Sequence, residues 1–368
     1  MATKVFEGFD HYNVQADFLA RSGWLQWQWI GGGSAPTLSF PTGRNSLGKC
    51  LEWSVGSAGV STDRINAVFA DRNAEAFIGH ASKMPPQGTS PIGMWVFFYD
   101  TTVPAVQLSV HFNEVNYSVS VYRGDGFVGG ATLLGTSANN VWTNTVWQFL
   151  EYHLKVATSG GSFEVRINNN VVLTITGVNT QASANAWFDS MAFATSPNAI
   201  AYNAANFIDD FYYNDTTTGP GLVPANSYLG DASVATLFAI GNDSVAWTPL
   251  AGANWQEISE VAMDSDTSYN STSTVGNEDR FNFAALSSAL NTAFAVQVTG
   301  AYRKDDGGTR TIQQSVTSGG TETYGSSHNI PDTNYAYFTD LFVLNPTTGL
   351  NWTLTDINAI KGAYKLTA

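Results

Sequence analysis

The sequence has little charge, a single cysteine and no long apolar run. Charged residues make up 12% of the chain, about half the usual share, and small polar residues and glycine take their place. Because Cys50 is alone, a framework of disulfides is excluded. The apolar stretches are short, as at 93–98, whereas a membrane-spanning helix needs about twenty apolar residues. We therefore expect a globular protein held together by its core.

Basic residues are also scarce, since 16 lysines and arginines stand against 30 acidic residues and the formal net charge is -14. Phosphate groups are bound by clustered lysine and arginine, so we expect no nucleic-acid partner and no binding to a membrane. No apolar signal region opens the sequence at 1–12, which predicts folding in a cytoplasm. The composition is nevertheless typical of extracellular β-proteins, and a virion released by lysis would reconcile the two.

Residues that favour β-strands are abundant: 43% of the chain is hydrophobic, and aromatic residues alternate with small turn formers. This composition predicts an all-β fold. A Thr-, Gly- and Pro-rich stretch at 214–226 predicts a linker, stiffened by Pro220 and Pro224. It divides the chain into a domain at 1–213 and a smaller β-rich domain at 227–368. We expect the second domain to be a β-sandwich with one short C-terminal helix.

Alternation of apolar and polar residues is clearest between residues 149 and 177. At 149–157 and 162–177 apolar residues take every second position, which is the period of a half-buried strand. Asn168, Asn169 and Asn170 suit a hairpin turn because asparagine tolerates a positive φ. Three consecutive antiparallel strands are predicted. The polar residues expected on their wet face are Glu151, His153, Lys155, Glu164 and Arg166.

Shorter patterns predict the remaining elements. No helical period is found before residue 200, and 62–82 predicts a strand, a turn and a strand. Near the C-terminus, Thr353 and Asp356 form a capping-box pattern that predicts a helix within 353–366, ending at Gly362. The other predicted strands are 94–100, 106–112, 117–126, 188–195, 228–240, 255–264, 280–286 and 335–346, with a hairpin at 294–320 whose turn is at 305–308.

The stretch FIDDFYYND, residues 207–215, places two adjacent carboxylates among aromatic residues. In a regular strand Asp209 and Asp210 point to opposite faces, so they cannot act together on one bound sugar. Three interpretations stay open, and they apply to Asp215 as well. The carboxylates can be structural, with one facing solvent and another capping backbone N–H groups near the end of the strand. They can also bind a calcium ion or, least in keeping with the geometry, act in catalysis.

A second acidic stretch at 264–279 could also supply oxygen ligands. It lacks the spacing of an EF-hand, so the alternatives are a calcium site and a solvated loop. No GxSxG, HExxH or Walker motif occurs, and the five histidines are far apart in the sequence. The sequence therefore predicts no enzyme, and no cofactor other than calcium. The candidate ligands are Asp264, Asp266, Asn270, Asn277, Glu278 and Asp279.

Three tryptophans, Trp24, Trp27 and Trp29, lie close together near the N-terminus. An exposed tryptophan can stack on a sugar ring or bind a protein partner, whereas a buried one packs. The high average burial of tryptophan favours packing in the core. Contact with a glycan or a partner is the alternative for all three residues.

Three passages, 117–137, 146–177 and 188–215, resemble the concanavalin A-like (laminin-G-like) jelly roll found in structural proteins of tailed bacteriophages. The resemblance implies that 207–215 is the closing strand of a β-sandwich and lies beside an N-terminal strand near 6–12. Its two aspartates would then belong to a structural signature, and no catalytic residues are implied. The passages that resemble the accompanying C-terminal β-rich part are 228–260, 295–321 and 345–366.

This resemblance favours a non-enzymatic component of a tailed phage particle, in the tail as a fibre, an appendage or the baseplate periphery. Other virion proteins would be its partners, and it would self-associate, as a trimer if it forms a fibre. The alternatives are a carbohydrate-binding (lectin-like) module, a jelly-roll glycoside hydrolase and a capsid decoration protein. A host-surface glycan is a further expected partner, suggested by the tryptophans and by Tyr117, Tyr122 and Tyr212.

Overall fold

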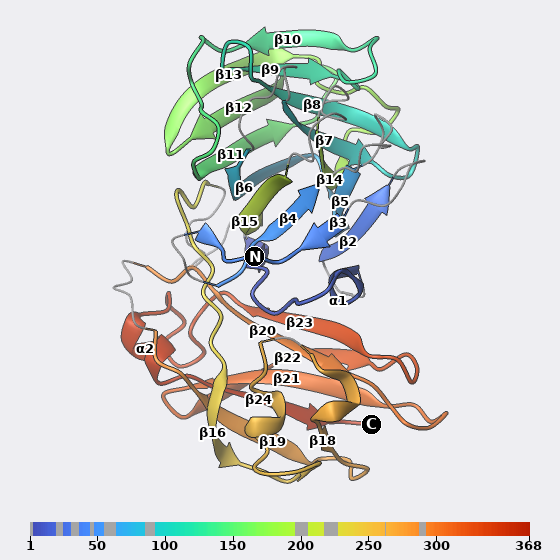
Figure 1. Cartoon of the computed structure of the whole chain (residues 1–368), viewed down its shortest axis with the longest axis vertical. Helices are drawn as coiled ribbons and strands as arrows, with labels where there is room; N and C mark the ends of the chain where they lie inside the picture. The colour runs from blue at the N-terminus through green and yellow to red at the C-terminus, as the bar shows by residue number, and fades with distance from the viewer. Residues whose placement is uncertain are drawn as a thin grey trace.

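Two large antiparallel sheets packed face to face form the N-terminal part, and a smaller sheet region forms the C-terminal part (Figure 1). This arrangement confirms the predicted all-β class and its jelly-roll sandwich. Among the residues described here, no helix has the length and apolar character to cross a membrane. The computed structural model describes residues 3–19, 25–30, 37–44, 48–54, 64–84, 93–195, 205–216, 227–261, 263–286 and 292–368.

The first large sheet has the strand order β13-β12-β11-β6-β15-β4-β3, and β1 also pairs with β15. The strand that contains FIDDFYYND therefore lies beside the N-terminal strand, as the resemblance implies. The strands of this eight-stranded sheet are β1 (Thr3–Glu7), β3 (Thr37–Ser39), β4 (Leu51–Ser54), β6 (Glu75–Lys83), β11 (Gln148–Lys155), β12 (Gly161–Ile167), β13 (Asn170–Val178) and β15 (Ala205–Asp215).

The second large sheet has seven strands in the order β10-β9-β8-β7-β14-β5-β2. A five-residue helix, α1 (Gln15–Leu19), precedes β2, and the sequence did not predict it. The strands are β2 (Leu25–Ile30), β5 (Arg64–Asn73), β7 (Met94–Asp100), β8 (Ala105–Asn113), β9 (Ser118–Arg123), β10 (Thr132–Thr136) and β14 (Phe188–Thr195).

Alternation within each strand decides which side chains fill the space between the two sheets. In β7, Val96 and Phe98 point into the sandwich core and are fully buried. Trp95 and Phe97 point to the opposite side and form a separate cluster. Each large apolar side chain buried in the core contributes about 1.5–3 kcal/mol, so the many core residues stabilise the sandwich without any disulfide.

The C-terminal part contains a five-stranded sheet in the order β16-β19-β24-β21-β22, a ribbon of β20 and β23, and a small pair of β17 and β18. The predicted capping box of Thr353 and Asp356 is confirmed, and it starts the helix α2 (Leu354–Asn358). The strands are β16 (Ala239–Ser244), β17 (Thr248–Pro249), β18 (Asn270–Ser271), β19 (Glu278–Phe283), β20 (Val296–Tyr302), β21 (Thr311–Ser318), β22 (Thr321–Asn329), β23 (Ala336–Phe342) and β24 (Lys361–Leu366).

Several predicted elements are confirmed in the jelly roll. The strands predicted at 94–100 and 188–195 coincide with β7 and β14. The three consecutive strands are β11, β12 and β13, paired in sequence. Asn168 and Asn169 have φ values of 49° and 67°, the positive values expected at the hairpin turn.

The strand, turn and strand predicted at 62–82 are confirmed as β5 and β6, which belong to different sheets. One prediction of strand pairing is wrong. The predicted hairpin at 294–320 is not formed, because β20 pairs with β23 and β21 pairs with β22 and β24. Alternation predicts a strand but not its partner, and a long chain offers several partners of similar pattern.

The predicted C-terminal helix is shorter than expected, since it ends at Asn358 and the chain continues as β24. Gly362 does not stop the helix. It lies in β24, where a Cβ atom would come within 2.9 Å of the Phe283 ring. Among the described residues of 255–264 no strand forms, and a short 3-10 helix covers Gln256–Ile258.

The predicted linker at 214–226 begins too early by two residues, because β15 continues through Asn214 and Asp215. Both residues are buried. Residues 217–226 lie outside the described residues.

Candidate functional site

A β-bulge in β15 brings both carboxylates of FIDDFYYND to one place. The pairing register with β6 shifts between Asp209 and Tyr212, and Asp210 has a φ of 52°. Aspartate tolerates this left-handed backbone better than most residues. Because a bulge interrupts the alternation of side chains, the expectation that Asp209 and Asp210 point to opposite faces is wrong.

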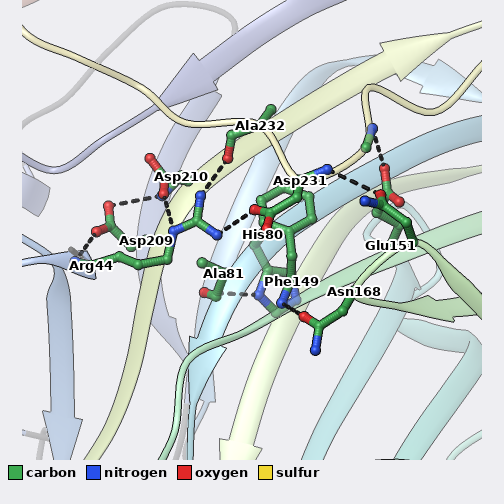
Figure 2. A network of polar contacts seen from close by, with 12 residues as sticks. Arg44, His80, Ala81, Phe149, Glu151, Asn168, Asp209, Asp210, Asp231 and Ala232 are labelled. Atoms are coloured by element: carbon green, nitrogen blue, oxygen red, sulfur yellow. Dashed lines mark hydrogen bonds and ion pairs between the residues drawn. The ribbon is translucent and has the colours of Figure 1, made fainter. Parts of the chain in front are cut away.

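Arg44 lies beside both carboxylates (Figure 2). Its backbone N–H donates to Asp209 Oδ2 at 2.8 Å, and its Nε donates to Asp210 Oδ2 at 2.8 Å. The same guanidinium pairs with Asp231 and donates from Nη2 to the backbone oxygen of Ala232 at 2.7 Å. Arg44 thus connects β15 to a segment that follows the predicted linker.

Burial shifts the protonation of the two carboxyl groups. Asp209 and Asp210 are 4% and 5% exposed. Burial and the neighbouring Asp210 carboxylate raise the pKa of Asp209 to about 8. Burial raises the pKa of Asp210 to about 6, although Arg44 opposes this rise. Near neutral pH the pair therefore carries about one negative charge, which faces the guanidinium of Arg44.

Residues 227–238 cross the outer face of the eight-stranded sheet without forming a strand, and we call them the strap. The strand predicted at 228–240 is thus wrong over most of its length. Leu229 and Ala232 pack against Phe149 and Tyr212 on that face. Four backbone N–H groups of the strap donate to jelly-roll side chains at 2.7–3.1 Å, the acceptors being Asp210 Oδ1, Glu151 Oε1, Tyr212 Oη and Asn169 Oδ1.

The strap covers much of the face that was predicted to be wet. Glu151 is 1% exposed, and its Oε1 accepts from Tyr212 Oη at 2.5 Å and from the Gly230 N–H at 2.9 Å. Burial raises the pKa of this carboxyl group. Tyr228 of the strap stacks on the guanidinium of Arg166, with 3.8 Å between Cζ and the ring centroid. The prediction that Glu151 faces water is therefore wrong.

The other acidic candidates each have a separate partner. Asp215 pairs with Lys4 at 3.0 Å, and Asp266 pairs with Arg303 at 2.8 Å. Asp279 is buried and accepts hydrogen bonds from backbone N–H groups. Within the described part of the chain, no group of three or more His, Cys, Asp or Glu could hold a metal ion. These contacts favour the structural interpretation of both acidic stretches.

The three tryptophans do not form one surface. Trp27 is 1% exposed and stacks on Phe18 in the sandwich core, with 5.0 Å between ring centroids. Trp29 is half-buried against the same core. Trp24 lies outside the described residues. For Trp27 the structure favours packing over contact with a glycan or a partner.

The outer face of the seven-stranded sheet carries aromatic side chains where polar ones are usual. Trp95 stacks on His111 with 4.3 Å between ring centroids, and four of the six rings are half-buried, so that part of each ring reaches solvent. We call this surface the aromatic face. Its residues, from three neighbouring strands and the turn after β9, are Trp95, Phe97, Tyr99, His111, Tyr122 and Phe127.

Two buried hydrogen-bond donors on this side of the sheet have no acceptor among the described residues. Arg64 is 6% exposed, pairs with Asp125 at 2.8 Å and lies 3.9 Å from the centroid of Phe97, but its Nε is unpaired. Asn66 accepts a hydrogen bond from Ser190, but its Nδ2 is unpaired. A buried unpaired donor costs about 1–3 kcal/mol.

The strands of this face are predictable from the sequence, but the aromatic face is not among the predicted features. The available signal was the run MWVFFYD, in which Trp95, Phe97 and Tyr99 alternate with core residues. Of the three tyrosines named as glycan candidates, Tyr122 lies on the aromatic face. Tyr117 packs against the core and Tyr212 is buried beneath the strap.

Comparison with known proteins gives structural likenesses alone. No protein-family model matches the chain, and no curated protein matches it. Among solved structures, the cellulose-induced protein Cip1 is 12% identical with a TM-score of 0.43, covering 62% of this chain and 100% of that one. The carbohydrate-binding module CBM66 from Bacillus subtilis is 7% identical with a TM-score of 0.32, covering 51% and 100%. The carbohydrate recognition domain of Emp46p is 10% identical with a TM-score of 0.34, covering 52% and 89%.

Proposed function

We propose that this chain is a non-catalytic carbohydrate-binding protein and that its aromatic face contacts the sugar. The observation that supports this most is the set of half-buried rings on one sheet face, Tyr99, His111 and Tyr122. Such rings offer flat apolar surfaces to the C–H faces of a sugar. Apolar groups exposed together on a sheet face are typical of a binding surface.

The carboxylates with the most perturbed pKa values support binding without catalysis. Both oxygens of Asp209 and both oxygens of Asp210 accept hydrogen bonds from the backbone or from Arg44. They are buried under the strap, so a substrate has no access to them in this arrangement. Their raised pKa values therefore follow from an attachment role.

A glycan array probed with the purified chain tests the proposal. The variant with Tyr99→Ala and Tyr122→Ala removes two half-buried rings of the aromatic face and is expected to lose at least tenfold in affinity for any glycan that binds. Tyr335→Ala, which removes a tyrosine of the C-terminal part, is the matched control and should bind like the parent. Equal binding by all three proteins would refute the assignment to this face.

A role in a tailed phage particle is a second candidate, supported by the resemblance of the passages around β9, β12 and β15 and by β20. Every residue of β20 is only half-buried, including Val296, Val298 and Tyr302. Apolar residues left incompletely covered in one copy are typical of subunit packing. In this proposal the protein resides in the virion, and its partners are other virion proteins and further copies of itself, three in a fibre.

Mass spectrometry of purified particles and the molar mass of the purified chain in solution test this second candidate. We expect the chain among the particle proteins and a trimeric mass for a fibre. Absence of the chain from particles of a phage that encodes it would refute the virion role. A glycan-binding chain in such particles would satisfy both proposals.

A further inference from the structure

Resting on the proposed carbohydrate contact, we infer that the turn at 124–131 is a lid over the aromatic face and that the ligand beneath it is a neutral oligosaccharide. The turn joins β9 to β10 and folds back onto the sheet. A Cβ atom at Gly126 would come within 2.9 Å of the rings of Trp95 and Tyr122. In its present position the lid therefore covers the largest ring of the aromatic face.

Few contacts hold this lid down. Asp125 Oδ2 accepts from Arg64 Nη2 at 2.8 Å. The Ser109 hydroxyl donates to the Gly124 oxygen at 2.8 Å and accepts from the Gly126 N–H at 3.0 Å. The Gly124 N–H donates to the backbone oxygen of Gln107 at 3.0 Å. The Phe127 ring lies edge-on to Trp95 and Phe97, with 5.6 and 6.2 Å between ring centroids. Asp125 is thus the one charged group of the lid that pairs with the sheet below.

Glycines near both ends of the lid allow the backbone to change conformation there. Gly124, Gly129 and Gly130 have positive φ values of 86°, 90° and 83°, and glycine passes between such conformations without steric cost. No atom lies within 4 Å of an added Cβ at Gly129 or Gly130. Val128 at the tip is 62% exposed, so its side chain is not buried by the closed position of the lid.

One of the two unpaired donors lies against the closed lid. Arg64 pairs with Asp125 of the lid, and its Nε has no acceptor among the described residues. An opened lid would give a ligand access to Arg64 Nε, which donates. Asn66 lies two positions further along β5, on the same side of the sheet. Sugar hydroxyl and ring oxygens accept such bonds, so a bound sugar would satisfy a donor that the closed lid does not.

The negative charge of the protein favours a neutral sugar over an anionic one. The chain carries a formal net charge of -14, which repels an anionic polysaccharide at long range. The cation that contacts the lid, Arg64, is already paired with Asp125. A neutral sugar avoids this repulsion and still supplies acceptor oxygens.

The variant Asp125→Asn removes the ion pair between the lid and Arg64. Asp125 Oδ1 accepts a hydrogen bond from the Phe127 N–H at 3.0 Å, and the asparagine Oδ1 can still accept it. The ion pair with Arg64 is lost. Asp306→Asn is the matched control, because Asp306 also accepts from a backbone N–H two residues on and pairs with Arg310. Opening of the lid is measured without any ligand, as the quenching of Trp95 fluorescence by acrylamide. The contribution of Trp95 is the difference in quenching between each protein and the same protein carrying Trp95→Phe.

We expect Asp125→Asn, and not Asp306→Asn, to increase the quenching of Trp95. We also expect Asp125→Asn to bind the neutral probes maltoheptaose or cellohexaose about threefold or more tightly than the parent. The reason is that fewer molecules are in the closed state, which does not bind the sugar and so lowers the apparent affinity. Unchanged quenching overturns the lid, whatever binds. Increased quenching with no binding of any array glycan supports the lid and refutes the carbohydrate function. Tighter binding of oligogalacturonate than of both neutral probes overturns the ligand class.

Discussion

The two outer faces of the jelly roll differ in what covers them. On the eight-stranded sheet the chain's own strap lies in place, and four of its backbone N–H groups have side-chain acceptors. On the seven-stranded sheet half-buried rings reach solvent, and Arg64 and Asn66 keep unpaired donors. The first face is satisfied internally and attaches the C-terminal part. The second has unused binding capacity, so we assign ligand contact to it.

We call the outer face of the eight-stranded sheet, which the strap covers, the strap face. Arg44→Ala should lower the free energy of unfolding most, because it removes the cation that links the strap to this face. The Arg44 and Asp210 side chains are 10% and 6% exposed, so the variant leaves a buried carboxylate without its cation. Loss of one partner from a buried ion pair costs about 3–5 kcal/mol. Arg310→Ala removes an exposed pair with Asp306 and should cost about 0–1 kcal/mol. Denaturant unfolding of the two variants measures both values, and equal losses would refute the special role of Arg44.

Gly79→Ala should have the next largest effect. An added Cβ would lie 2.2 Å from the Tyr212 ring, whose hydroxyl bonds Leu229 and Glu151. The ring must shift and weaken the strap contact, at a cost of about 1–3 kcal/mol. Gly307→Ala, where no atom lies within 4 Å of the added Cβ, serves as the control and should change little. A stable Gly79→Ala protein would show that the ring can move freely.

Removal of a hydroxyl from each face compares them directly. Tyr212→Phe removes the bonds to Glu151 and to the Leu229 N–H and should cost about 1–2 kcal/mol. The Tyr99 hydroxyl has no hydrogen-bond partner among the described residues, so Tyr99→Phe should stay within about 0.5 kcal/mol. The difference between the two midpoints of unfolding is the quantity to measure. A similar loss in both variants would contradict the contrast between the faces.

How far the sequence predicts this molecule depends on the range of the interaction. Alternation is a local property, so β7, β14 and the hairpin turn at Asn168 follow from it directly. The pairing of β20 with β23 does not, because many strands share one pattern. The bulge at Asp210 is also beyond a local argument, since a period of two presumes a regular strand.

The candidate site was predictable only in part. Tyr122 could be named from its residue type, but its position beside Trp95 needs the order of strands in the sheet. Trp27 illustrates the converse, because a tryptophan in an alternating stretch gives no sign of which side faces the core until the partner sheet is known. The strap face depends on Arg44, which lies 166 positions from Asp210, and no sequence pattern connects the two.

The pH dependence of stability tests the ionisation of one carboxyl group beneath the strap. A carboxyl group with a raised pKa binds more protons in the folded than in the unfolded state, so the free energy of unfolding falls as pH rises from about 4 to its folded pKa. Below about pH 6.5 this fall is opposed, because burial lowers the pKa values of His11, His80 and His111 to about 4, 3 and 4. Asp209, with a folded pKa of about 8, acts alone among these groups between about pH 7 and 8.5. There we expect the unfolding free energy to fall by at most about 1.4 kcal/mol per pH unit, and Asp209→Asn to remove the slope. A parent protein with a flat profile above pH 7 would mean that Asp209 is already ionised beside Asp210.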